Sequence, residues 1–225
     1  MAPNPLANLP SNTVWHLLVD AAKQALGESG YALHRVPGRG LSNVWLYTVD
    51  GQRGSASIRT SRNRWFAFPP LEGGTRWKTL DDVDQVVVAA LDHADNPLHV
   101  EIYVFDAPTV RERFDAAYAA RTAAGHRVKD DYGMWINLDR DDRGAVTGVG
   151  SGLAQEFPAV ATYRLGDLAE RSARVSMELS RSLGDNGAGG EPATIANVVA
   201  AARERVAAIA GVGLEAVKVD VRIEY

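Results

Sequence analysis

The sequence predicts an α+β fold: an antiparallel sheet meander with flanking helices, plus a C-terminal helix–strand module. Three observations predict it. Two segments have the apolar spacing of amphipathic helices, several short runs are rich in β-branched and aromatic residues, and a Gly-rich stretch precedes a last helix and strand. The chain has 225 residues, of which 46% are hydrophobic and 23% charged. That is enough apolar material for one sizeable core or two small ones.

The N-terminal part is predicted to form one helix and then a meander of strands. Apolar residues from Val14 to Ala25 recur at helical spacing, which predicts a helix over about 12–27 that ends at the glycines following it. The predicted strands cover 31–36, 43–49, 52–60 and 64–68. Between the second and third of them, Asp50-Gly51 is a strong hairpin turn.

The middle of the chain is predicted to add a hairpin, a helix and a strand. Thr79 to Asp82 has the form of a helix start, but the apolar run from Val86 to Val88 favours a brief turn leading into a strand over 85–91. That strand pairs with 99–105, where apolar residues alternate. A helix over 108–124 and a short strand over 133–138 follow. Residues 1–146 are therefore expected to close as one α+β domain containing the basic meander 31–80.

The C-terminal part differs in texture from the rest. Residues 147–183 are predicted to form a hinge and an amphipathic helix, and 184–192 a Gly-rich linker. Residues 193–225 are predicted to form a helix followed by a strand over 217–223. Such a small module cannot bury its apolar face alone. We therefore expect it to dock on the main domain or to pair with a second copy of the chain.

Several absences bound the function. The chain has no cysteine, which excludes disulfides, thiol catalysis and thiolate metal sites. It has no apolar run of membrane-spanning length and no secretory signal pattern, so a cytoplasmic protein without a membrane partner is expected. Walker, Gly-x-Ser-x-Gly and His-Glu-x-x-His motifs are missing. We therefore expect a non-enzymatic protein without a cofactor.

The charge is distributed unevenly along the chain. Residues 31–80 carry a net charge of +6 and residues 81–160 a net charge of -8. Most cations of the first segment are arginines, interleaved with tryptophan and phenylalanine. Nucleic-acid sites of the groove or single-strand type need this mixture, because cations neutralise phosphates and flat side chains contact bases. The sequence therefore predicts DNA or RNA, or another polyanion, as partner, and the candidate residues are Arg53, Arg59, Arg62, Arg64, Trp65, Arg76 and Lys78.

Two interpretations without nucleic-acid binding explain the same residues. The basic meander is also expected to pair with the acidic half of the chain, above all with Asp81, Asp82 and Asp84, while its tryptophans lie in the core. In the second of these interpretations, the protein is an interaction or assembly factor and the arginines contact another protein.

One hairpin also suggests metal-dependent catalysis. Asp84 precedes the first strand, and Glu101-Ile102-Tyr103 lies on the second. This arrangement over about 79–106 resembles the core of PD-(D/E)XK nucleases, which implies that Asp84 and Glu101 hold Mg²⁺. Tyr103 stands where that family has its lysine, so the resemblance implies either a degenerate, DNA-associated relative or an active nuclease. In the turn of the hairpin, His93 and His99 are a second possible metal site, although ordinary loop polarity explains them equally well.

Overall fold

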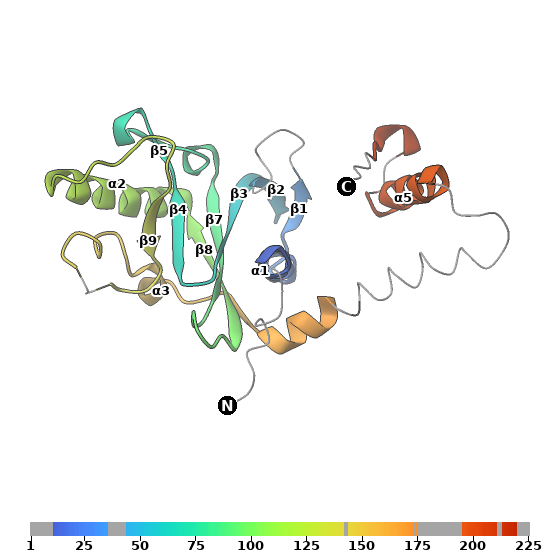
Figure 1. Cartoon of the computed structure of the whole chain (residues 1–225), viewed down its shortest axis with the longest axis horizontal. Helices are drawn as coiled ribbons and strands as arrows, with labels where there is room; N and C mark the ends of the chain where they lie inside the picture. The colour runs from blue at the N-terminus through green and yellow to red at the C-terminus, as the bar shows by residue number, and fades with distance from the viewer. Residues whose placement is uncertain are drawn as a thin grey trace. The chain divides into compact units, whose positions relative to one another are not determined.

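The computed structural model describes residues 11–35, 44–141, 144–172, 174, 195–210 and 213–219. The chain divides into two compact units, residues 1–173 and 174–225 (Figure 1). The first unit is mixed α and β, as the sequence predicts. The predicted internal boundaries at 146, 183 and 192 stay predictions.

The elements of the first unit follow the predicted order, with several short additions. Its helices are α1 (Ser11–Glu28), α2 (Ala107–Ala123) and α3 (Leu153–Glu156), with single 3-10 turns η1 (Glu72–Gly74) and η2 (Leu80–Asp82). Its strands are β1 (Ala32–Arg35), β2 (Val44–Val49), β3 (Gln52–Ser61), β4 (Trp65–Phe68), β5 (Pro70–Leu71), β6 (Arg76–Trp77), β7 (Gln85–Leu91), β8 (His99–Asp106), β9 (Met134–Asn137) and β10 (Ala161–Arg164).

Six strands form the main sheet, in the order β1-β2-β3-β7-β8-β10. The β2–β3 hairpin turns at Asp50 and Gly51, whose φ angles of 49° and 77° are both positive, as a tight type I′ turn requires. The predicted hairpin of β7 and β8 is confirmed, with Gln85 opposite Asp106 and Leu91 opposite Val100. All pairs in this sheet are antiparallel except β3 with β7, which is parallel.

The predicted meander is corrected at its fourth strand. β4 does not continue the main sheet but pairs with β9 in a separate two-stranded ribbon. The place beside β3 is taken by β7, because this strand is apolar on both faces and is stable only in the interior of a sheet. Strand β10 was not predicted from the sequence, and it pairs with β8 at the opposite edge of the sheet from β1.

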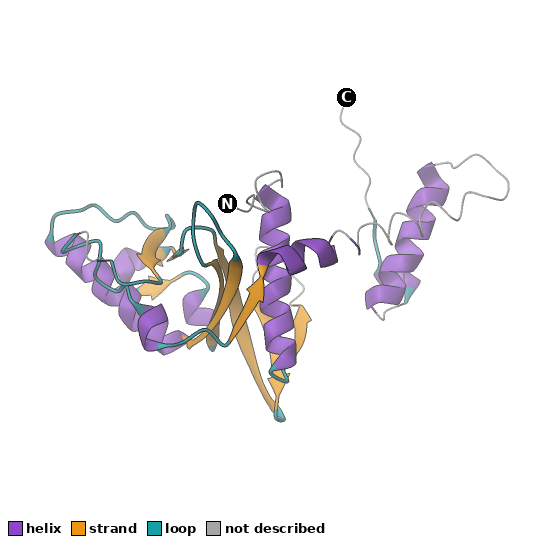
Figure 2. Ribbon diagram, turned by 90° about the horizontal axis from the view of Figure 1, so that it is seen from below, coloured by secondary structure: helices purple, strands orange, loops and turns teal. Residues whose placement is uncertain are grey.

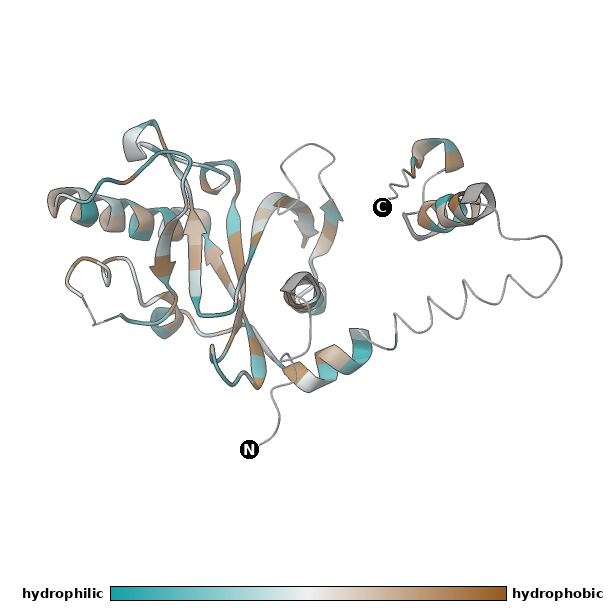
Figure 3. Ribbon diagram, in the orientation of Figure 1, coloured by the Kyte–Doolittle hydropathy of each residue, from teal (hydrophilic) through white to brown (hydrophobic). Residues whose placement is uncertain are grey.

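The main sheet separates two hydrophobic cores. Helix α1 covers one face, where Leu18 and Leu26 pack against Ile58 and Val87. Helix α2 and the β4–β9 ribbon cover the other face, where Phe66 and Phe114 pack with other aromatic side chains. Figure 1 shows the strands between α1 and α2, and Figure 2 shows α1 running along the strands. In Figure 3 the strands between these helices carry many of the hydrophobic residues.

Residues after the β4–β9 ribbon complete the first unit. Leu153 of α3 is buried against the second core, and residues 165–172 are helical, with Leu165 and Leu168 buried against the first. The predicted helix over 165–183 is therefore confirmed over its described first half. Residues 175–192, including the predicted Gly-rich linker, lie outside the described part of the chain.

In the second unit, α5 (Ile195–Ala210) confirms the predicted last helix, and a 3-10 turn, η4 (Leu214–Ala216), follows. Residues 217–219 form no strand, so the predicted strand over 217–223 is not seen there, and 220–223 lie outside the described residues. The docking or self-association of this module stays a prediction. None of the helices described is long and apolar enough to cross a membrane.

Phe114 provides a test of the second core. Its ring centroid lies 5.6, 5.3 and 5.2 Å from those of Phe66, Phe68 and Trp77, and the side chain is fully buried. We expect Phe114→Ala to lower the free energy of unfolding by about 3–5 kcal/mol, because the substitution removes these ring contacts and leaves a cavity in the core. Chemical denaturation of the full chain measures this difference in the free energy of unfolding. Tyr132→Ala, at an exposed position, is the control, and equal stability of both variants would contradict this packing.

Candidate functional site

Arg64, a predicted nucleic-acid contact, is instead held inside the protein. Its guanidinium donates to both carboxylate oxygens of Asp139 at 2.5 and 3.0 Å and to Glu101 at 2.8 Å. It also donates to the Tyr103 hydroxyl at 2.9 Å and to the Leu91 carbonyl at 3.1 Å. Only 13% of its side chain is exposed. With these partners Arg64 is not available to a ligand, and it ties the β3–β4 turn to β8 and to the end of β9.

Tyr103 completes this cluster. Its hydroxyl donates to Glu101 at 2.6 Å and accepts from Arg64. Burial of the ring, and then the hydrogen bond to Glu101, raise the pKa of Tyr103 to about 12. For Arg64, burial lowers the pKa, but the hydrogen bonds with Asp139, Tyr103 and Glu101 outweigh burial and raise it above its ordinary value. The cluster is a charge network that stabilises the fold.

The other predicted cations divide into paired and unpaired side chains. Arg76 pairs with Glu72, and Lys78 pairs with Asp131 at 2.6 Å. Arg53 and Arg62 are exposed, and neither has an ion-pair partner within the described structure. Arg53 lies beside a cavity of about 320 Å³ at the β2–β3 hairpin. Trp65 is half-buried on β4.

The structure does not bring the predicted metal ligands together. Glu101 lies opposite Ala90 of β7, whereas Asp84 precedes the other end of that strand. Six residues of extended chain separate the two levels, about 20 Å at ~3.3 Å per residue. Asp84 accepts hydrogen bonds from the Ser55 amide at 2.7 Å and the Ser55 hydroxyl at 2.9 Å. These two carboxylates are too far apart to share a cation.

The hairpin turn contains no metal site either. The Asp92 carboxylate accepts the backbone N–H groups of His93 and Leu98 and contacts His99 Nδ1 at 3.0 Å. These contacts organise the turn. In the parts of the chain that the structure describes, no three His, Asp or Glu side chains form a group that could hold a metal ion.

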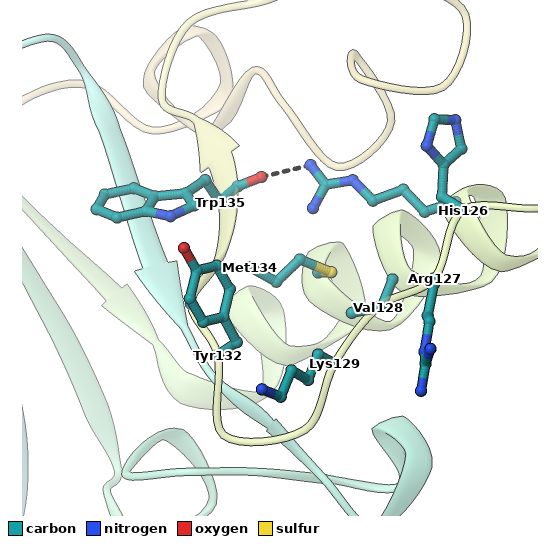
Figure 4. Close-up of a pocket in the computed structure, with 9 residues that line it drawn as sticks. His126, Arg127, Val128, Lys129, Tyr132, Met134 and Trp135 are labelled. Atoms are coloured by element: carbon teal, nitrogen blue, oxygen red, sulfur yellow. Dashed lines mark hydrogen bonds between the residues drawn. The ribbon is translucent and has the colours of Figure 1, made fainter.

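A basic and aromatic pocket lies where the sequence reasoning did not look, around the loop 124–133 between α2 and β9. The pocket has a volume of about 510 Å³. Four of its nine lining residues are Arg, Lys or His, and none is acidic (Figure 4). The lining consists of Arg121, His126, Arg127, Val128, Lys129, Tyr132, Gly133, Met134 and Trp135. In Figure 4, the rings of Tyr132 and Trp135 lie on one side of the pocket, and His126 and Arg127 lie on the other.

The acidic residues of this loop are engaged elsewhere. Asp130 accepts the Gly73 amide at 3.1 and 3.2 Å, and Asp131 pairs with Lys78. These contacts connect the loop to the 72–78 segment, and the charge of Asp131 is paired with Lys78. Arg127 and Lys129 are exposed and have no carboxylate partner among the residues described. The lining of the pocket therefore contains cations and no carboxylate.

Arg121 and Trp135, which both line the pocket, are joined by a hydrogen bond. Arg121 donates to the Trp135 carbonyl at 2.6 Å, and burial lowers the pKa of Arg121, which has no acidic partner in the described structure. The Trp135 side chain projects outward because alternate residues of β9 face opposite sides: Met134 and Ile136 are buried, whereas Trp135 is 50% exposed. Tyr132 is 71% exposed. Two large rings thus stand in solvent beside four cationic or titratable side chains.

A second cavity adjoins the first. It has a volume of about 290 Å³ and shares Gly133 and Trp135 with the first pocket. Arg59 of β3 lines it, together with Trp15 of α1 and the β4–β9 ribbon. Arg59 is a predicted nucleic-acid residue, and the structure places it next to this basic and aromatic region.

Sequence reasoning missed the loop because it counted charge in long segments. Residues 81–160 are strongly acidic in total, and this total conceals His126-Arg127-Val128-Lys129, three of whose four side chains are cationic or titratable. Net charge counted over shorter segments, together with the two aromatic residues Tyr132 and Trp135, could have identified this loop from the sequence.

Arg64 provides a test of the internal network. We expect Arg64→Met to lower the free energy of unfolding by about 2 kcal/mol, because Glu101 and Asp139 would lose their cation while remaining partly hydrated. Denaturant unfolding of the full chain measures this. Arg62→Met, at an exposed position in the same turn, should stay within about 0.5 kcal/mol of the wild type. If both variants unfold alike, Arg64 is not the anchor.

Tyr103 gives the network a pH dependence. The pKa of this hydroxyl is about 12 in the folded protein, compared with an unfolded value of about 10. Its contribution to stability is therefore complete below about pH 10 and is lost as the pH rises toward about 12. Chemical denaturation at a series of alkaline pH values should show a smaller loss of stability in Tyr103→Phe than in the wild type over this range. Parallel curves for the two proteins would refute the assignment.

Comparison of the chain with protein-family models, with curated proteins and with solved structures finds no match. Its function is therefore inferred from the chemistry of its own residues.

Proposed function

We propose that this protein binds single-stranded nucleic acid through a surface around Trp135. The Trp135 surface consists of Arg121, His126, Arg127, Lys129, Tyr132 and Trp135. The observation that carries the proposal is the composition of this pocket, whose lining combines cations with two exposed rings and contains no carboxylate. It keeps the class of partner that the sequence predicts, but moves the binding residues from the meander 31–80 to the loop that follows α2.

The two kinds of side chain match the two parts of a nucleic-acid strand. Arg127 and Lys129 are exposed cations that can contact phosphates, and release of counterions from those phosphates favours binding. The rings of Tyr132 and Trp135 can stack on bases whatever their identity. In a duplex the bases are already stacked on one another. Exposed rings therefore favour a single strand over a duplex.

The anchoring of the loop supports the same proposal. Asp130 and Asp131 hold the loop against the 72–78 segment, so the cations and rings are positioned before a ligand arrives. Such preorganisation reduces the entropy lost on binding. Lys78, a predicted nucleic-acid contact, thus has a positioning role here through its ion pair with Asp131.

Fluorescence anisotropy of labelled single strands and of a duplex of the same sequence tests this proposal. We expect the single strands to bind more tightly than the duplex, with an affinity that falls steeply between about 50 and 200 mM salt. Trp135→Ala should weaken single-strand binding by about 1–3 kcal/mol through the lost stacking. The double variant Arg127→Ala/Lys129→Ala should reduce the slope of log affinity against log salt by about two.

Arg53→Ala is the matched control, because it removes an exposed arginine that lies beside a different cavity. Its affinity and salt slope should equal those of the wild type. Circular dichroism and thermal unfolding show whether each variant is folded. Absence of binding at low salt, or equal effects of Arg53→Ala and the loop double variant, would overturn the proposal.

A further inference from the structure

Arg59 is in an unusual electrostatic position. Its guanidinium carbon lies 4.3 Å from the centroid of the Phe68 ring, and its Nε atom is buried without a hydrogen-bond partner. No carboxylate among the described residues pairs with it. Burial lowers the pKa of Arg59 to about 10, so the side chain is still a cation at neutral pH. The residue as a whole is half-buried, and the partial loss of hydration of a cation without a counterion costs stability.

Arg64 in the same chain shows what a structural arginine looks like. It lies in the turn that follows β3 and has two carboxylates, a hydroxyl and a carbonyl as partners. Among the residues that the structure describes, Arg59 has none of these partners. Arginines near this strand can therefore have carboxylate partners, and the lack of one at Arg59 is specific to its own surroundings.

The cavity beside Arg59 has a lining that specifies a second feature of its ligand. Apart from Arg59 and the Thr60 hydroxyl, its walls are apolar or aromatic: Trp15, Ile58, Phe66, Ala67, Pro69, Gly133 and Trp135. An inorganic anion would use only the arginine and leave these walls without contacts. An anionic group joined to a flat, weakly polar ring would satisfy both the cation and the tryptophans.

We infer that this cavity is a subsite for one nucleotide, with the phosphate on the Arg59 guanidinium and the base against the Trp15 and Trp135 walls. The inference rests on the proposed function, because Trp135 and Gly133 belong to both pockets. A strand that crosses the Trp135 surface would place one of its nucleotides here. The guanidinium fork can donate two parallel hydrogen bonds to phosphate oxygens, which supplies the missing counterion.

Mononucleotide binding to the full chain tests the subsite. Adenosine and uridine monophosphate, the corresponding nucleosides and inorganic phosphate are titrated separately, with calorimetry and tryptophan fluorescence as readouts. We expect saturable binding of the monophosphates, and affinities at least about 10-fold lower for a nucleoside or for phosphate alone. Arg59→Gln should weaken monophosphate binding by about 10- to 100-fold, since it removes a charged hydrogen-bond donor. Arg62→Gln, an exposed arginine nearby in sequence, should leave it unchanged.

A stability measurement separates a ligand-binding arginine from a structural one. Arg59→Met keeps the packing against Phe68 but removes the unpaired charge. We expect its thermal unfolding temperature to equal or exceed that of the wild type without ligand, and its gain in temperature on adding monophosphate to be lost. A lower unfolding temperature of Arg59→Met would show that the arginine serves the fold, and would overturn the inference.

The remaining outcomes distinguish the subsite from the Trp135 surface. Oligonucleotide binding that depends on Trp135 but not on Arg59, without binding of monophosphates, would overturn the subsite and leave the proposed function intact. Monophosphate binding through Arg59 without oligonucleotide binding would contradict the proposed function and support the nucleotide pocket. An aromatic carboxylate that binds as tightly as the monophosphates would overturn the assignment to a nucleotide.

Discussion

The fold depends on the burial of β7 on both of its faces. Five consecutive residues of this strand, from Val86 to Ala90, have no exposed surface. A strand without a polar face must lie inside a sheet and must be covered by a layer on each side. Helix α1 provides one layer, and α2 with the β4–β9 ribbon provides the other. The two cores of the first unit follow from this requirement.

The central position of β7 also determines how the candidate site forms. β7 lies parallel to β3, so the chain must return to the starting end of β3 before it enters β7. β4 lies on this return path and pairs with β9 on the second face of the sheet. The pairing places Trp135 opposite Ala67, and the cavity between this ribbon and β3 contains Arg59. The basic and aromatic region is thus assembled from segments that are distant in sequence.

Two arginines near the end of β3 have contrasting environments. Arg64 is satisfied by Asp139, Glu101 and Tyr103, and it connects three parts of the chain. Arg59 is desolvated over Phe68 and has no anion beside it among the described residues. The same contrast applies to the loop 124–133, where Asp131 pairs with Lys78 while Arg127 and Lys129 remain exposed. The difference between these cations lies in their partners and not in their charge.

Local signals determined most of the elements from the sequence alone. Helical spacing located α1 and α2, Asp50-Gly51 located a hairpin, and the Val86–Val88 run identified a buried strand, since each signal acts within a few residues. Only the tertiary structure decided that β4 leaves the sheet, that β3 and β7 are parallel, and which arginines have partners. Strand order and ion pairing depend on residues that are far apart in sequence, and the local spacing of a segment contains no information about them. For this reason the combination of cations and exposed rings around Trp135 became visible only in the fold, although the sequence shows that the chain has both kinds of residue.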